Sequence, residues 1–351
     1  MNVSGPGSGP AGVPAAIALS PILSARYRPQ DLEAVQAAAP GSQLLSVSLE
    51  GLADDDLSDV EVLLRGPMPA ATFDRLVVRC PRLRWVHSAT AGVERVLTPT
   101  ALERGLAITN ARGVFSRPVA EYVLMVILAV SRRLPQLLEL QRERTWQPLP
   151  AVEMREISIG IIGLGSIGTA IARLATAFGC RVLAVSRRSD GTASHRSLGM
   201  DEQEQPPVEP HIDRLFRTDE LPVMLGQCDF AVLALPLTPS TDNLFDDAMF
   251  QHMKPGSWLI NIARGRLVDD RALGRAVRQG RIGGAVLDTF RDEPLPADSP
   301  LYELPNVIIT PHTSWWSGRV LDRSIALFCE NLGRFSAGQP LHNLVDPDLG
   351  Y

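Results

Sequence analysis

Lysine is almost absent from this sequence, and its scarcity narrows the choice of partners. Lys254 is the only lysine among 34 basic residues of the 351-residue chain, and 39 acidic residues bring the net charge to -5. Such a chain carries no broad cationic field, so we expect neither nucleic acid nor an anionic membrane as a partner. The length and the 45% hydrophobic content predict two globular domains that bind small molecules.

Cysteine pairs and long apolar runs are also missing. The four cysteines are Cys80, Cys180, Cys228 and Cys329. They form no CxxC pair and have no histidine at metal-ligand spacing, so we expect buried thiols and no metal site. No apolar span reaches 18 residues, and the stretch "AGVPAAIALSPILSA" contains two prolines with no basic residue before it. We expect a cytoplasmic protein with a frayed start over residues 1–14.

Short apolar runs alternate with stretches of helical periodicity, a pattern typical of parallel α/β sheets. The first series of expected strands covers residues 15–19, 43–47, 60–64 and 83–88. The second covers residues 158–162, 181–185, 229–235, 258–263, 283–287 and 306–310. The polar, proline-rich residues 189–217 predict a surface excursion, and a last helix over 317–337 is expected to pack on the first domain.

A strongly apolar helix is expected between the two series. The segment "RPVAEYVLMVILAVSRRL" places Pro118 in the first turn and is apolar on nearly every face. Such a helix must be covered by its own domain or by a second subunit.

The segment "GLGSIG" follows an expected strand and opens an expected helix with apolar residues at Ile167, Ile171, Leu174 and Phe178. In that context it is typical of a dinucleotide fingerprint, in which Gly163 permits the turn, Gly165 lets a pyrophosphate approach and Gly168 allows close packing. The alternative is a glycine-rich turn without a ligand. The expected cofactor contacts of this turn are Gly163, Leu164, Gly165, Ser166, Ile167 and Gly168.

Two arginines follow the next expected strand, where an NAD enzyme usually carries an acidic residue. The segment reads Ser186, Arg187, Arg188, and two guanidinium groups suit a 2′-phosphate. The sequence therefore favours NADP(H), with NAD(H) as the alternative if both arginines are only solvated loop residues.

Polar residues follow the remaining strands of the second series. Open parallel sheets bind ligands outside the carboxyl ends of their strands, so these residues are expected at one edge. They are Pro236 with Thr241, Ala263 with Arg264, Asp288 with Glu293, and His312. Each has a structural alternative, such as an ion-pair partner for Arg264 or an ordinary loop histidine for His312. Their joint position beside the fingerprint favours a functional site.

These residues stand in motifs that resemble the D-isomer-specific 2-hydroxyacid dehydrogenases. The motifs are "ATAGVERV", "RPVAEYVL", "GLGSIG", "ALPLTPSTDNLF", "NIARGRLVDDRAL", "AVLDTFRDEPLP", "NVIITPHTS" and "ENLGRFSAGQPLHNLVD", in that order along the chain. The resemblance implies a flavodoxin-like substrate domain over residues 1–110 and 318–351, with a Rossmann-like dinucleotide domain over 111–317 inserted between them.

The resemblance also implies roles for individual residues. Arg264, Glu293 and His312 would be the catalytic residues. Backbone N–H groups of Ala91, Gly92 and Val93 would bind the substrate carboxylate, in a cleft between the domains. A homodimer would form through the helix over 118–141.

The implied reaction is reversible hydride transfer between nicotinamide C4 and C2 of a 2-oxo acid. His312 as imidazolium would donate the proton, with Glu293 on its other ring nitrogen. Arg264 would pair with the substrate carboxylate and carbonyl oxygen. Asp288 and the backbone after Ala263 would hold the nicotinamide carboxamide.

The sequence departs from the family pattern at two places. Arg291 stands where a carboxylate is frequent, and "TSWWSG" follows the histidine. Trp315 and Trp316 are therefore candidates for substrate choice, with packing of the domain hinge as the equal alternative.

Several functions remain open within this resemblance. A glyoxylate/hydroxypyruvate reductase or another 2-ketoacid reductase is expected first. A 3-phosphoglycerate dehydrogenase is the alternative, disfavoured because no regulatory domain follows before Tyr351. Phosphonate or formate oxidation lacks a distinctive motif. A nucleotide-sensing protein like the transcriptional corepressors of this fold is the alternative from another class.

Overall fold

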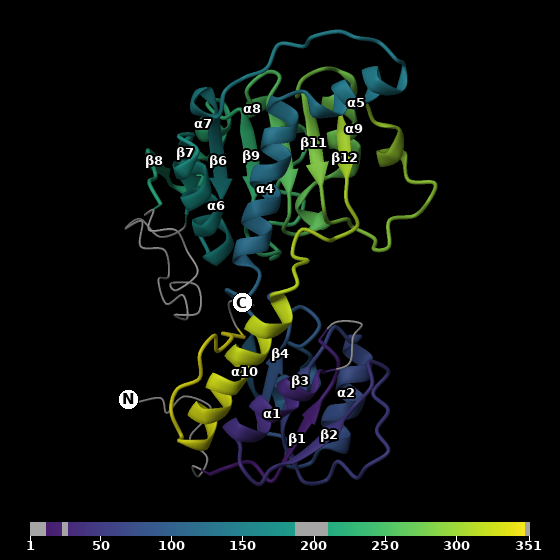
Figure 1. Cartoon of the computed structure of the whole chain (residues 1–351), viewed down its shortest axis with the longest axis vertical. Helices are drawn as coiled ribbons and strands as arrows, with labels where there is room; N and C mark the ends of the chain where they lie inside the picture. Colours follow the sequence, from purple (N-terminus) through teal and green to yellow (C-terminus); the bar gives the residue numbers. More distant parts are fainter. Residues whose placement is uncertain (1–11, 23–26, 187–209, 348–351) are drawn as a thin grey trace. The chain divides into compact units, whose positions relative to one another are not determined.

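The computed structural model describes residues 12–22, 27–186 and 210–347. The chain forms two compact units, one of Met1–Phe115 with Ser317–Tyr351 and the other of Ser116–Trp316. Each unit is a parallel sheet with helices against it (Figure 1). The predicted class, α/β with two doubly wound parallel sheets, is confirmed. Most of the expected frayed start, residues 1–11, lies outside the described residues.

The first unit has five parallel strands in the order β2-β1-β3-β4-β5. They are β1 (Ala16–Leu19), β2 (Gln43–Ser46), β3 (Val60–Arg65), β4 (Trp85–Ser88) and β5 (Ala107–Asn110). This order is that of flavodoxin-like sheets, as the resemblance implied. The sequence did not predict β5, because its four residues "AITN" contain a single aliphatic β-branched side chain.

Helices cover both faces of the first sheet. They are α1 (Pro29–Ala38), α2 (Ala70–Arg79), α3 (Pro99–Glu103) and α10 (Val320–Ser336). The C-terminal helix α10 packs against α1, and its Phe328 stacks on the buried Trp85 of β4 with ring centroids 5.4 Å apart. The expected last helix therefore packs on the first unit, as predicted from the sequence.

The second unit has seven parallel strands in the order β12-β11-β10-β9-β6-β7-β8. They are β6 (Ser158–Ile162), β7 (Arg181–Val185), β8 (Arg214–Phe216), β9 (Phe230–Leu233), β10 (Trp258–Asn261), β11 (Gly284–Leu287) and β12 (Val307–Ile309). The order reverses between β6 and β9, which is the arrangement of a Rossmann sheet.

The edge strand β8 corrects one expectation from the sequence. Residues 189–217 were expected to form one surface excursion, but Arg214–Phe216 pair with Leu183–Val185 of β7. The buried Phe216 and two flanking arginines form a run too short to be recognised by period. Residues 187–209 of the expected excursion lie outside the described residues.

The apolar segment between the two series forms two helices and not one. Helix α4 (Ser116–Ser131) ends before Arg133, whose left-handed φ of 58° precedes α5 (Leu134–Arg142). Helix α4 packs against α6 (Ser166–Ala177), and it is seen in front of the sheet in Figure 1. The single helix expected over 118–141 is therefore divided at Arg133, and its second part, α5, has no buried residue.

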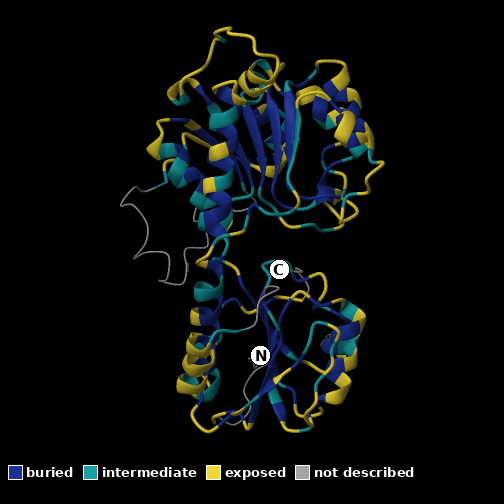
Figure 2. Cartoon of the chain, turned by 45° about the vertical axis from the view of Figure 1, so that its right-hand side comes forward, coloured by how far each residue is buried: buried dark blue, intermediate teal, exposed yellow. Residues whose placement is uncertain are grey.

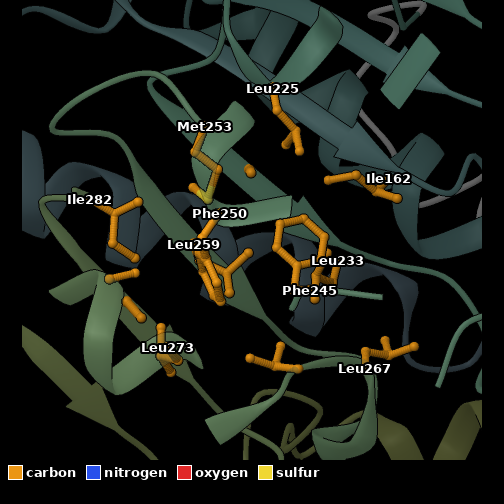
Figure 3. Packing of buried hydrophobic residues seen from close by; sticks show 14 of the residues in the cluster. Ile162, Leu225, Leu233, Phe245, Phe250, Met253, Leu259, Leu267, Leu273 and Ile282 are labelled. Atoms are coloured by element: carbon orange, nitrogen blue, oxygen red, sulfur yellow. The ribbon is translucent and has the colours of Figure 1, made fainter. Parts of the chain in front are cut away.

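Short helices cover the opposite face of the second sheet. They are α7 (Leu221–Leu225), α8 (Asp247–His252) and α9 (Asp270–Arg278), and 3-10 turns lie at Met154–Glu156, Thr218–Glu220, Gly265–Leu267 and Pro300–Glu303. Helix α9 begins where the Asp269 carboxylate accepts hydrogen bonds from the N–H groups of Arg271 and Ala272. The core beneath these helices joins Leu225, Phe245, Phe250, Leu259 and Leu273, as Figure 3 shows.

Burial is concentrated in the strands of both units, whereas the outer helix faces are exposed (Figure 2). Cys80, Cys180 and Cys228 are buried as expected, and Cys329 is half-buried. Burial raises the pKa of the Cys228 thiol to about 12, so it stays protonated. No helix of the described part of the chain is long and apolar enough to cross a membrane.

Candidate active site

The glycine-rich turn joins β6 to α6 at the point where the strand order reverses. Gly163 has a left-handed φ of 108°, and a Cβ there would lie 2.6 Å from the Ala234 carbonyl oxygen. A Cβ on Gly168 would lie 2.0 Å from the Gly163 carbonyl oxygen, whereas one on Gly165 would meet no atom within 4 Å. Two of the glycines therefore close the turn, and the third leaves open space at the N-terminus of α6. This arrangement fits the pyrophosphate of a dinucleotide.

The other residues expected to contact the cofactor lie in and after this turn and after β7. Leu164, Ser166 and Ile167 are half-buried in and after the turn. Ser186 follows β7, and its N–H donates to the Phe216 carbonyl at 3.3 Å. Arg187 and Arg188 lie outside the described residues, so their contact with a 2′-phosphate stays a prediction.

The loop after β9 is closed by the side chain of Thr241. Its hydroxyl donates to the Pro236 carbonyl at 2.9 Å and accepts from the Thr238 N–H at 2.8 Å. Arg266 pairs with Asp242 in the next part of this loop. These bonds hold the loop as a compact turn beside the strand that neighbours β6.

Arg264 follows β10 on a backbone that Asn261 fixes. The buried Asn261 side chain donates to the Arg264 carbonyl at 2.8 Å and accepts from the Ala263 N–H at 3.1 Å. The Arg264 guanidinium itself donates to the Ala263 carbonyl at 2.7 Å. Asn261 was not predicted from the sequence, although a polar residue inside the apolar run "WLINIA" was its signal.

Gly265 brings the Arg264 loop against the Glu293 loop. A Cβ on Gly265 would lie 1.9 Å from the Phe290 carbonyl carbon and 2.2 Å from the Arg291 nitrogen. The Arg291 guanidinium adds hydrogen bonds to the Asn243 side chain and to the Val268 carbonyl. Arg291, which replaces a frequent carboxylate of the family pattern, therefore joins three loops of this edge.

Glu293 and His312 form a hydrogen-bonded pair. Glu293 Oε2 lies 2.8 Å from His312 Nδ1, and Glu293 Oε1 accepts from the Phe290 N–H at 2.9 Å. Because the carboxylate is an acceptor, His312 donates from Nδ1, and Nε2 is the ring nitrogen left for proton transfer. The two side chains are 33% and 41% exposed, so the pair is accessible to a substrate.

Asp288 follows β11 and carries no exposed surface. One carboxylate oxygen accepts from the Thr310 hydroxyl at 2.6 Å and the Thr313 N–H at 2.8 Å, and the other from the Ser314 N–H at 3.0 Å. The structure thus places Asp288 against the turn that carries His312. Its predicted contact with a nicotinamide carboxamide stays a prediction.

The two tryptophans after His312 differ in their surroundings. The Trp315 indole N–H donates to the His312 carbonyl at 2.8 Å, whereas Trp316 is 59% exposed. Their rings lie 5.1 Å apart at a tilt of 46°. Trp315 is therefore bonded directly to the backbone of the histidine.

The loop expected to bind the substrate carboxylate belongs to the first unit. The Ala91 carbonyl accepts from the Asn110 side chain at 3.0 Å, and the Gly92 carbonyl from the Thr90 hydroxyl at 2.7 Å. Across residues 12–22, 27–186 and 210–347, none of the recorded hydrogen bonds uses the N–H of Ala91, Gly92 or Val93. A carboxylate is the kind of ligand these donors suit.

Metal ligands do not gather in the described residues. There, no group of three or more histidine, cysteine, aspartate or glutamate side chains could hold a metal ion.

Comparisons with known proteins agree with this geometry. The family model for the NAD binding domain of D-isomer specific 2-hydroxyacid dehydrogenases matches residues 124–314. A glyoxylate reductase from Korarchaeum cryptofilum is 32% identical over 295 residues, which cover 82% of each chain.

Solved structures of similar fold cover nearly the whole chain. A D-isomer specific 2-hydroxyacid dehydrogenase from Xanthobacter autotrophicus Py2, in complex with NADPH and MES, matches with a TM-score of 0.79 at 30% identity, over 97% of this chain and 100% of that one. An NADPH-dependent glyoxylate/hydroxypyruvate reductase from Sinorhizobium meliloti, in complex with NADP and sulfate, matches with a TM-score of 0.77 at 26% identity, over 96% and 100%. The chain therefore belongs to the D-isomer specific 2-hydroxyacid dehydrogenase family of NAD(P)-dependent oxidoreductases.

Proposed function

We propose that this enzyme reduces small 2-oxo acids, with glyoxylate and hydroxypyruvate as the first candidates, and uses NADPH. The observation that carries the proposal is the Glu293 and His312 pair, joined at 2.8 Å beside the Arg264 loop and on the sheet edge of the glycine-rich turn. The similar proteins named as glyoxylate reductases, and the similar structures that contain NADPH or NADP, support the substrate and the cofactor.

His312 is the proton donor in this proposal. Its Nδ1 is held by Glu293, so Nε2 donates a proton to the oxygen of the substrate carbonyl as that oxygen gains negative charge. Glu293 cannot turn away without losing its bond from the Phe290 N–H. The bound nicotinamide supplies the hydride.

Arg264 orients the substrate. Its guanidinium pairs with the carboxylate and the carbonyl oxygen of the 2-oxo acid, which fixes the reacting face and stabilises the growing charge. Asn261 keeps the backbone of Arg264 in place. The amide groups of Ala91, Gly92 and Val93 bind the substrate carboxylate in the same scheme, which makes the first unit the substrate domain.

The cofactor is held by the second unit in this proposal. The residues are those of the turn over 163–168, with Ser186, Pro236, Thr241, Ala263 and Asp288 at the following strand ends. Arg187 and Arg188 bind the 2′-phosphate, which makes NADPH the preferred cofactor and NADH the weaker one.

The enzyme is a homodimer of the cytoplasm in this proposal. Helices α4 and α5 and the segment after them expose large apolar side chains to water in the single chain. These are Met125, Leu134, Leu137, Leu138 and Trp146. A second copy seated on this surface would bury them.

A panel of 2-oxo acids tests the function. Glyoxylate, hydroxypyruvate, phenylpyruvate, 2-ketoisocaproate and 3-phosphohydroxypyruvate are each assayed with NADPH and with NADH. We expect the highest kcat/KM for the two small acids with NADPH. A tenfold preference for NADH would overturn the roles of Arg187 and Arg188, and a preference for the phosphorylated acid would favour a 3-phosphoglycerate dehydrogenase. NADPH binding without turnover of any acid would favour a nucleotide-sensing protein.

A further inference from the structure

His312 has a backbone conformation that needs support. Its φ is 49°, in the left-handed region that side chains with a Cβ rarely adopt. Its N–H donates to the Thr310 carbonyl at 2.9 Å, so Pro311 is the middle residue of a three-residue turn. The direction of the imidazole depends on this turn, because the turn sets the Cα–Cβ bond of His312.

Asp288 holds the turn from beneath. Its buried carboxylate binds the Thr313 and Ser314 N–H groups immediately after His312 and the Thr310 hydroxyl before it. A carboxylate without exposed surface is stabilised only when its oxygens accept hydrogen bonds. The three donors therefore fix the ends of the turn on both sides of the histidine.

The hydroxyl of Tyr122 completes this arrangement from helix α4. It lies 2.6 Å from Thr310 Oγ1, and Thr310 Oγ1 lies 2.6 Å from Asp288 Oδ1. Thr310 has one hydroxyl proton, and the Asp288 carboxylate can only accept it. Tyr122 must therefore donate to Thr310, and the chain of donors runs from Tyr122 to Thr310 to Asp288.

Tyr122 is suited to remain a donor. It is half-buried on α4, and burial raises its pKa to about 12, although the Thr310 bond acts in the opposite direction. The hydroxyl thus keeps its proton across the pH range of an enzyme assay. No other role for this hydroxyl follows from the proposed chemistry.

We propose that Tyr122 is a positioning residue for His312, acting through Thr310 and Asp288. The proposal rests on the proposed function of His312 as proton donor. Tyr122 touches neither substrate nor cofactor in it. Its hydroxyl keeps the Thr310 proton directed at Asp288, and Asp288 in turn keeps the left-handed turn that aims the imidazole.

Single variants that differ by one hydroxyl test the proposal. We expect Tyr122→Phe to lower kcat for glyoxylate about 3- to 10-fold, the range that corresponds to one neutral hydrogen bond. Thr310→Val should lower kcat at least as far, because the Thr310 hydroxyl donates to a carboxylate. The KM for NADPH should change less than about twofold. Thr310→Ser keeps the hydroxyl and should restore kcat to near the wild-type value.

A double variant tests whether Tyr122 acts through Thr310. Once Thr310 lacks its hydroxyl, Tyr122 has nothing to position, so Tyr122→Phe/Thr310→Val should be no slower than Thr310→Val alone. The solvent deuterium isotope effect on kcat should rise in both single variants, because proton donation becomes slower. A role in stability alone would leave the isotope effect unchanged.

Tyr27→Phe is the matched control. Its hydroxyl also makes a 2.6 Å hydrogen bond, to the Ser20 carbonyl of the first unit, and its loss should change thermal stability without changing the isotope effect. Wild-type kcat in Tyr122→Phe, multiplicative losses in the double variant, or a loss of NADPH affinity would each overturn the proposal.

His312→Gln in the same assay separates the two possible failures. Normal turnover of that variant overturns the proposed function and this inference with it. Slow turnover of His312→Gln together with normal turnover of Tyr122→Phe overturns the inference alone.

Discussion

His87 lies inside strand β4 of the first unit, whereas His312 follows strand β12 of the second. The His87 ring has no exposed surface, and its Nδ1 lies 2.8 Å from the Thr109 hydroxyl. Thr109 also accepts from the Trp85 indole N–H, so one hydroxyl joins the two rings. Burial without a charged partner lowers the pKa of His87 to about 3. His312 is instead 41% exposed and is hydrogen-bonded to a carboxylate.

Two arginines repeat this contrast. Arg65 at the end of β3 is buried, and its guanidinium donates to the backbone carbonyls of Gly66, Met68 and Arg95. Arg264 follows β10 on a loop that joins the Glu293 loop. Parallel sheets of the same class thus carry the same residue types for different purposes. A side chain that is buried inside a strand or at its end serves the core, whereas a side chain placed past the strand end can meet a ligand.

Apart from loss of His312 itself, the largest effect on the edge of the second sheet is expected from loss of the Arg264 charge. Arg264→Gln should lower kcat/KM for glyoxylate by about 100- to 1,000-fold, because the substrate loses both its anchor and the stabilisation of the growing alkoxide. The matched control is Arg266→Gln, since Arg266 is an exposed partner of Asp242. Its kcat/KM should stay within about threefold of wild type. Equal losses in both variants would contradict the role of Arg264.

The burial of His87 should appear in the pH dependence of the free energy of unfolding. The folded pKa of His87 lies below that of the unfolded chain, so the unfolded state binds more protons between about pH 6.5 and 3. The free energy of unfolding is then highest above pH 6.5 and is lost as the pH falls, by about 2 kcal/mol at pH 5 relative to pH 7.

Denaturant titrations at pH 5, 6 and 7 measure this loss. In His87→Gln the free energy of unfolding should be lower at pH 7 but nearly constant over this interval, because glutamine does not titrate. The same slope in wild type and variant would show that another group is responsible.

The two tryptophans distinguish side chains that support His312 from side chains that contact the substrate. Trp315→Phe removes the N–H that binds the His312 carbonyl and should lower kcat about threefold for every acid tested. Trp316→Phe alters an exposed ring and should leave kcat unchanged. A change in the preference between phenylpyruvate and glyoxylate in either variant would instead assign that ring to the substrate pocket.

The sequence predicted most of the strands, because apolar β-branched runs such as 158–162 and 181–185 are long enough to show their character. It also placed Arg264, Glu293 and His312 on one sheet edge from topology alone, and the hydrogen bond between Glu293 and His312 agrees with that placement. It missed β5 and β8, whose short runs are defined by pairing with neighbours.

The contacts that support His312 could not be predicted from the sequence, for a different reason. Tyr122 and Thr310 are 188 positions apart along the chain, and their contact depends on where α4 packs. The left-handed turn at His312 follows from the bonds that Asp288 accepts, which no local pattern encodes. Asn261 is the exception, since a polar side chain inside a buried strand calls for a partner.

The most direct measurement is the single-turnover rate of NADPH oxidation with glyoxylate for His312→Gln and His87→Gln. Glutamine keeps a polar side chain in each place and cannot carry the imidazolium proton. With the rates normalised to NADPH-binding sites, His312→Gln should be slower than wild type by about two to four orders of magnitude. His87→Gln should react within about threefold of wild type. A near-normal rate in His312→Gln would contradict the assignment of the proton donor.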